Sequence, residues 1–235
     1  MATLINLIRN PTVMSLAIGV LPALFWLWFW LREDRTNPEP RRVLAATFIA
    51  GGCATVAALY LERTAARSIG QGVYLIAAWA LIEEMTKYAA AIGAALMRKS
   101  FDEPVDAMVY LVTAALGFAA VENVLFLSKA FSMNGTAGIL LTGNLRFFGA
   151  MLVHIVSSAT VGFGIAFGFY ERMPKRILYT TIALLTATLL HTMFNFFILQ
   201  ENGKYVFSVL SILWLAVVTI FLLFEESKRL KPQQK

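Results

Sequence analysis

Seven long apolar runs constrain the fold of this chain more than any other feature. They cover roughly residues 12–31, 43–61, 72–97, 104–130, 145–170, 176–199 and 204–224, and charged or turn-forming stretches separate them. Runs of about 18 or more apolar residues have the length that an α-helix needs to cross a bilayer. Only 14% of the residues are charged, where a soluble domain carries about a quarter. The sequence therefore predicts an all-α, polytopic transmembrane helical bundle with about seven spans.

The spans leave no room for a soluble domain, so we expect a single integral membrane domain over residues 1–235, in the plasma membrane. The segments 32–42, 98–103, 171–176 and the C-terminal tail carry 4, 2, 3 and 4 Lys and Arg, against six in the segments on the opposite side. Because basic loops stay in the cytoplasm, this predicts N-out/C-in. The weakest boundary is 131–144, where a short interfacial or re-entrant piece is possible.

The composition also limits the partners of the chain. The net charge of +6 indicates attraction to the anionic inner leaflet of the lipid bilayer. We expect no nucleic-acid partner, because no soluble reader module accompanies this charge. A single cysteine excludes an intrachain disulfide.

Six ionisable side chains lie deep within the predicted spans, where each charge costs at least about 2.5–3.5 kcal/mol. Counted from the predicted outer ends at 1.5 Å per residue, they all lie roughly 12–18 Å below the outer surface. We therefore expect the third to sixth spans, residues 72–199, to form a catalytic four-helix core in which these groups share one wet cavity. The six are Glu83, Glu84, Lys87, Glu122, His154 and His191.

Helical spacing suggests how these groups pair. Lys87 follows Glu83 by four residues and Glu84 by three, so it can pair with either carboxylate. Two adjacent carboxylates do not easily both carry a charge, which favours a general acid/base role. The pattern predicts hydrolysis by a water that one of these two glutamates activates. His191 and Asn195 share a helix face and suit the stabilisation of the oxyanion.

Other functions remain open on the residues alone. Two His with Glu can form a zinc site, whose ligands would come from a set of four: Glu84, Glu122, His154 and His191. The helical H-E-x-x-H pattern is absent, so we favour no cofactor. Intramembrane Glu and His also form proton relays, so a proton- or ion-coupled transporter or a non-catalytic membrane partner is the alternative. Absence of G-x-S-x-G argues against a serine nucleophile.

Four motifs in order resemble the PrsW family of intramembrane proteases, which is related to the CAAX-prenyl endopeptidases. They are E-E-x-x-K at 83–87, F-A-x-x-E-N at 118–123, a mid-span His154 and H-x-x-F-N at 191–195, with D-x-x-V-Y at 106–110 as further support. The resemblance implies a bacterial membrane endopeptidase whose mechanism is glutamate-type or metal-assisted, and we favour the glutamate type. Such an enzyme makes the site-1 cut in single-span proteins such as anti-sigma factors, near the outer face, and so regulates a sigma factor.

The resemblance also implies roles for individual residues. The CAAX group has F-x-x-x-H where this chain has Glu122, so either Glu122 or His154 partners the base, and the two are expected to orient the water. Lys87 would tune the glutamate pair. Three further residues are expected to support this machinery: Asn123, Ser158 and Arg146.

Overall fold

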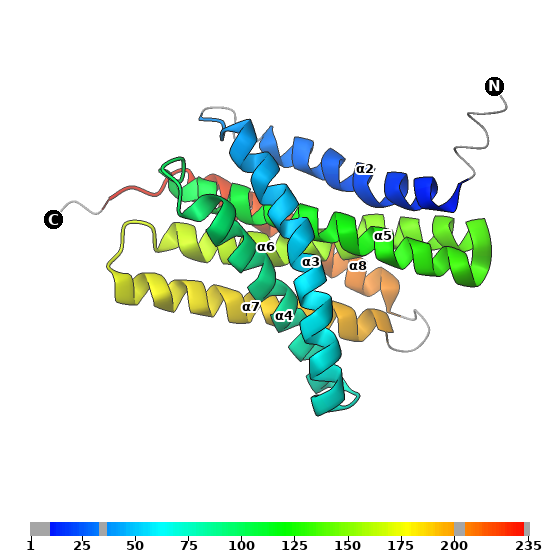
Figure 1. The fold of residues 1–235 in the computed structure, drawn as a ribbon. Coiled ribbons are helices and arrows are strands. Elements are labelled where there is room, and N and C mark those ends of the chain that lie inside the picture. Colours follow the sequence, from blue (N-terminus) through cyan, green and yellow to red (C-terminus); the bar gives the residue numbers. More distant parts are fainter. Residues whose placement is uncertain (1–9, 33–36, 200–204, 233–235) are drawn as a thin grey trace, which may run out of the picture.

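The structure of the protein, a computed structural model, describes residues 10–32, 37–199 and 205–232 as a helical bundle (Figure 1). No β-strand occurs within these residues, which confirms the all-α prediction. The elements are α2 (Pro11–Leu31), α3 (Arg41–Ile69), α4 (Val73–Ala91), the π-helix η1 (Ile92–Leu96), α5 (Pro104–Leu145), the π-helix η2 (Arg146–Ala150), α6 (Met151–Phe167), α7 (Met173–Leu199) and α8 (Val206–Ser227).

Helices α5 and α6 form the centre of the molecule. α5 packs against α2, α3 and α6, and α6 packs against α5, α7 and α8. Residues 104–120 and 151–159 are buried without interruption. α3 and α4 form a hairpin that crosses the other helices obliquely in Figure 1, with its tip projecting from the bundle. The polar residues of α4 are therefore carried onto the central helices from the side.

A sharp reversal at Gly135 divides α5 into two helical arms. Gly135 has φ of 60°, a conformation that glycine adopts at little cost. The chain then runs back along α5, since a Cβ at Gly143 would lie 3.6 Å from Leu127. The segment 131–144 is thus a helical hairpin, and its place as an interfacial or re-entrant piece stays a prediction.

Two glycines bring α3 and α5 into backbone contact. A Cβ at Gly51 would lie 2.0 Å from the carbonyl oxygen of Ala114, and one at Gly117 would lie 1.9 Å from that of Phe48. Small residues let helices approach this closely in membranes. The crossing holds the α3–α4 hairpin beside the segment of α5 that carries Phe118 and Glu122.

Five of the described helices are long and apolar enough to cross a membrane: α2, α3, α5, α7 and α8. The remaining two predicted spans correspond to α4, which has 19 residues and three charges, and to α6, which has 17 residues. These helices make the chain a multi-pass membrane protein. Seven spans and an N-out orientation stay predictions.

Several predicted span ends shift in the structure. The second span was expected to end at residue 61, but α3 continues to Ile69 and ends where Gly70 takes a φ of 76°. The residues between, ERTAARSI, include good helix formers such as Ala, Arg and Glu, so their charge does not end the helix. α7 begins at Met173 and α8 ends at Ser227, each three residues beyond expectation. The predicted start of the last span, residue 204, lies outside the described residues.

Candidate active site

Four helices direct ionisable side chains to one point inside the bundle. α4 supplies three of them, and α5, α6 and α7 supply one each. All are buried except Glu122, whose side chain is 16% exposed. The six residues that the sequence expected to converge do meet: Glu83, Glu84, Lys87, Glu122, His154 and His191.

Glu84 is the most fully bonded carboxylate of the cluster. Its Oε1 accepts a hydrogen bond from Lys87 Nζ at 2.6 Å and lies 2.8 Å from His191 Nδ1. Its Oε2 accepts a hydrogen bond from the hydroxyl of Ser158 at 3.2 Å. Oε1 therefore holds Lys87 and orients His191 while Oε2 is bonded to Ser158, so both oxygens of Glu84 are engaged.

Lys87 is fully buried and links Glu84 to His154. Its Nζ lies 3.0 Å from His154 Nδ1 and 5.1 Å from the centroid of the Phe118 ring. Since an ammonium only donates, Nδ1 accepts this hydrogen bond and His154 carries its proton on Nε2. Phe118, the first residue of the F-A-x-x-E-N motif, thus supplies an aromatic face to the buried cation.

Glu122 forms a second branch of the network. Its Oε2 lies 3.1 Å from His154 Nε2 and also pairs with Arg146, the first residue of η2. Arg146 donates a hydrogen bond to the side-chain amide oxygen of Asn123 as well, and its guanidinium lies 4.1 Å from the Phe126 ring centroid. A π-helix widens the turn, a deviation that often occurs at functional sites. Here it directs Arg146 toward α5.

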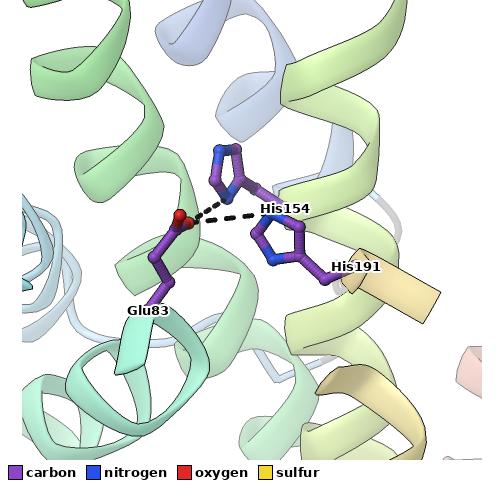
Figure 2. A group of neighbouring side chains, drawn as sticks. All are labelled: Glu83, His154 and His191. Carbon is purple, nitrogen blue, oxygen red and sulfur yellow. Dashed lines mark ion pairs between the residues drawn. The ribbon is translucent and has the colours of Figure 1, made fainter. Parts of the chain in front are cut away.

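Glu83 differs from its neighbour because one of its oxygens is buried without a hydrogen bond. Figure 2 shows this carboxylate directed at both histidines. Glu83 Oε2 lies 3.8 Å from His154 Nδ1 and 3.7 Å from His191 Nε2, too far for hydrogen bonds. The three side chains each offer one ligand atom within 4.8 Å of the others. An orphaned carboxylate oxygen facing two imidazole nitrogens is what a cation would satisfy.

These residues fit a metal ion by their chemistry. Two imidazole nitrogens and one carboxylate are the donor set of a catalytic zinc site, which leaves one position open. Glu84 bonds the far nitrogen of His191, as outer carboxylates do in such sites. Lys87 occupies His154 Nδ1 in this structure, so an ion bound there would have to displace it from that nitrogen, and Glu84 would remain its partner.

The group in the structure differs from the zinc ligands that the sequence suggested. We expected any ligand set to combine the two histidines with Glu84 and Glu122. The structure gathers Glu83 with the histidines instead. Glu84 and Glu122 lie behind the imidazole rings and bond their other nitrogens.

Three of the four further residues that the sequence singled out contact the cluster, and one does not. Ser158, Asn123 and Arg146 all bond members of the network, as described above. Asn195 lies one turn beyond His191 on α7 and is half-buried, and no hydrogen bond joins its side chain to the described residues of the cluster. Its role as an oxyanion donor therefore stays a prediction.

Sequence reasoning missed Glu62, which it assigned to a loop. Glu62 lies on α3 and is half-buried. Its carbonyl oxygen also accepts a hydrogen bond from the indole of Trp79, at 3.2 Å, which ties α3 to α4. The helix-forming residues after Glu62 were the signal that could have placed it on a helix.

A polytopic helical protein with carboxylates and imidazoles gathered at its centre has the architecture of a membrane enzyme that uses water as a reactant, or of a proton- or ion-coupled transporter. Comparison with known protein families identifies which kind of membrane protein this chain is. A profile described as "PrsW family intramembrane metalloprotease" matches residues 39–224, most of the chain and every residue of the cluster. The chain belongs to the PrsW family of intramembrane proteases, which confirms the resemblance seen in its motifs.

Curated relatives agree with this assignment. The chain is 30% identical over 192 residues to Protease PrsW of Clostridioides difficile (strain 630), covering 78% of this chain and 79% of the relative. It is 27% identical over 189 residues to Protease PrsW of Oceanobacillus iheyensis, covering 77% and 81%. It is 21% identical over 198 residues to Protease PrsW of Bacillus subtilis (strain 168), covering 83% and 87%. No solved structure matches the chain significantly.

Proposed function

We propose that this membrane protease hydrolyses a peptide bond of single-span membrane proteins, such as anti-sigma factors, near the outer face of the membrane. The observation that carries the proposal is the buried group of Glu83, His154 and His191, in which a carboxylate oxygen has no hydrogen-bond partner. The outer location follows from the depth of the cluster and the predicted N-out orientation. It is the location at which a first cut would start a proteolytic cascade.

The same observation favours a metal-assisted reaction over the glutamic type that the sequence favoured. Glu83, His154 and His191 would hold a divalent ion such as zinc. When bound, the ion would supply Lewis acidity toward a water molecule and toward the scissile carbonyl. The ligands are buried away from bulk water, which lowers the local dielectric constant. Electrostatic interactions between the charges of the site are therefore stronger than they would be in water.

We assign the general base to Glu122, although it bonds the nitrogen of His154 that faces away from Glu83, because one of its oxygens stays free. Its contacts with His154 and Arg146 both use Oε2, which leaves Oε1 to accept a proton. It is also the most exposed carboxylate of the cluster. As the water oxygen bonds to the scissile carbonyl carbon, Glu122 takes a water proton. It then returns the proton to the leaving nitrogen as the C–N bond breaks.

The remaining residues position these groups. Glu84 orients His191 and neutralises Lys87, and Ser158 fixes Glu84. The amide of Asn195, one turn from His191, is the candidate donor to the oxyanion that forms on the carbonyl.

The test uses purified protein in proteoliposomes with a panel of single-span, anti-sigma-like peptides, and mass spectrometry to detect cleavage. Wild type is compared with Glu83→Gln and with Glu225→Gln, a control at an exposed carboxylate far along α8. Each is assayed with and without a chelator, and bound metal is quantified by elemental analysis. We expect cleavage only by wild type and the control, its loss with chelator, and its recovery when zinc is added.

Other results would overturn parts of the proposal. Cleavage that survives chelation but is absent in Glu83→Gln would restore the glutamic mechanism, with Glu83 as the base. Cleavage that survives in both Glu83→Gln and Glu122→Gln would refute the assignment of the site. Intact peptides together with movement of protons or ions across the vesicle membrane would favour the transporter alternative.

A further inference from the structure

A cavity lies at the end of the bundle where α6 turns into α7. It has a volume of about 780 Å³. Its walls come from the end of α6, the connection to α7, the start of α7 and the segment after α8. The α6–α7 connection and the end of α8 lie at the same end of the molecule in Figure 1. No residue of the catalytic cluster lines this cavity, so it is a separate site.

The cavity carries an excess of positive charge. Its charged lining residues are three cations, Arg172, Lys175 and Lys231, and one carboxylate, Glu171. Glu171 pairs with Lys175 at 3.0 Å. Neither Arg172 nor Lys231 pairs with a carboxylate among the described residues. Like charges that share a cavity repel each other, so an anion bound between them would be stabilised.

An apolar hollow continues the cavity along the bundle, between α6 and α7. It measures about 210 Å³, and two aromatic residues, Phe167 and Tyr179, line both spaces. Their ring centroids are 5.0 Å apart. From Phe167 the hollow reaches Thr160, which lies seven residues, or about 10 Å, away along α6. A basic space that continues into an apolar one matches the two parts of a phospholipid, a charged headgroup and an acyl chain.

Small residues explain why the hollow exists. A Cβ at Gly164 would lie 2.3 Å from the Cβ of Ala183 and 2.8 Å from the carbonyl oxygen of Tyr179, so α6 and α7 touch there. Gly164 and Ala183 both line the hollow. Because neither projects far from its helix, a depression is left beside the rings of Phe163 and Phe167, whose centroids are 6.0 Å apart.

The hollow opens onto a surface that lipid covers. Phe167 and Ile182, which line it, are 50% and 52% exposed. Three leucines share the helix face of Ile182, because they lie four residues before it and three and seven residues after it. Leu178, Leu185 and Leu189 are all more than half exposed. In a multi-pass membrane protein such an apolar face contacts acyl chains, so the bilayer itself supplies the occupant of the hollow.

We propose that the cavity and the hollow together bind an anionic phospholipid of the surrounding membrane. Arg172 and Lys231 receive the headgroup phosphate, as basic pockets at the ends of transmembrane helices do. One acyl chain lies in the hollow between α6 and α7. A free phosphate ion would use the cavity alone, so the continuity of the two spaces favours a lipid. The inference does not depend on the protease function, although α6 and α7 also carry His154 and His191.

Native mass spectrometry of the delipidated protein in detergent tests the headgroup part of the site. The probes are phosphatidylglycerol and phosphatidylcholine with the same acyl chains. We expect the first to bind at least about tenfold more tightly than the second. Arg172→Gln/Lys231→Gln should remove this preference, whereas Arg41→Gln/Lys99→Gln should keep it. The control variant also removes one exposed Arg and one exposed Lys, but from positions that do not line the cavity.

A second arm tests the acyl part. Thr160→Trp fills the hollow, and Thr186→Trp is the matched control. Both hydroxyls donate to the carbonyl oxygen four residues earlier, but only Thr160 lines the hollow. Both variants should keep the melting temperature of the parent, and only Thr160→Trp should lower the affinity for phosphatidylglycerol, by at least about tenfold. Inorganic phosphate, which has no acyl chain, should not displace the lipid.

Three results would overturn the proposal. Equal binding of the two lipids would show that the site does not select an anionic headgroup. Equal loss of the preference in both charge variants would mean that general surface charge attracts the lipid. Displacement by inorganic phosphate, with no effect of Thr160→Trp, would assign the cavity to free phosphate instead.

Discussion

At the scale of single residues, Glu84 and Lys87 form a buried ion pair whose members depend on each other. Lys87 is completely buried, and within the described residues its one carboxylate contact is with Glu84, at 2.6 Å. Removal of one partner of such a pair leaves an uncompensated charge, which costs about 3–5 kcal/mol. Glu84 therefore contributes to folding as well as to the orientation of His191.

We predict that Glu84→Gln lowers both the melting temperature and the activity. The double variant Glu84→Gln/Lys87→Met should recover most of the lost stability, because no charge is left alone. It should not recover activity, since His191 still lacks its carboxylate and such outer partners contribute about 10–100-fold. Thermal unfolding in detergent and peptide cleavage measure the two effects. A double variant as unstable as the single one would contradict this account of the pair.

Arg146 acts through another residue, because its guanidinium holds Glu122 and Asn123 together. We predict that Arg146→Gln lowers kcat by about 10–100-fold with little change in KM, since Glu122 loses its position and no substrate contact is assigned to Arg146. Arg146→Lys should recover only part of kcat, because an ammonium lacks the fork that reaches both partners. Steady-state cleavage kinetics check this. A change confined to KM would assign Arg146 to substrate binding instead.

The convergence of these residues could be predicted from the sequence, but the role of each residue within the cluster could not. The high cost of charge in a bilayer made it clear that Glu83, Glu84 and Lys87 had to face inward with the histidines. Glu83 and Glu84 are adjacent and point about 100° apart on the helix. Which one meets the imidazole nitrogens depends on how α4 crosses α6 and α7, and side-chain spacing within one helix does not contain that information.

At the scale of elements, close crossings and reversals position the site. Glycine patterns in apolar segments leave open which glycine will contact another backbone, so the crossing of α3 and α5 was not predicted. The reversal at Gly135 was foreseen only as a weak boundary. Glu62 was missed because the end of apolar character was taken as the end of a helix, whereas α3 extends eight residues past 61, to Ile69.

We predict that Gly117→Ala destabilises the protein by about 1–3 kcal/mol, because the added methyl group would overlap the carbonyl oxygen of Phe48 and separate α3 from α5. The matched control is Gly93→Ala, where the added carbon meets no atom within 4 Å. That change should be neutral or slightly stabilising, since alanine is the better helix former. Melting temperatures of the two variants provide the comparison. Equal effects would mean that the crossing tolerates a wider separation.

At the scale of the whole molecule, the basic connections gather at one end. The α4–α5 and α6–α7 connections and the end of α8 lie together at the left of Figure 1, while the turn within α5 lies at the right. This agrees with the distribution of Lys and Arg from which the orientation was predicted. It does not depend on the exact number of spans.

We predict that this basic end faces the cytoplasm, as the positive-inside rule requires. Single cysteines are placed at Ser68, near the tip of the α3–α4 hairpin, or at Lys231, in a background in which the exposed Cys53 is replaced by Ala. A membrane-impermeant maleimide applied to intact cells should label position 68 and spare position 231 until the membrane is permeabilised. The opposite pattern would invert the orientation and move the site to the inner half of the membrane.

The arrangement of the cluster over four helices also sets conditions on biosynthesis. α4 emerges from the ribosome with Glu83, Glu84 and Lys87, and the single lysine can neutralise only one of the two carboxylates within the helix. Both histidines that face Glu83 come from α6 and α7, which are made later. In a nascent chain that stops before α7, insertion of the α4 segment into the bilayer is therefore unfavourable. Stable integration of α4 should occur late and together with the helices that complete the site, so assembly of the site and retention in the membrane become a single event.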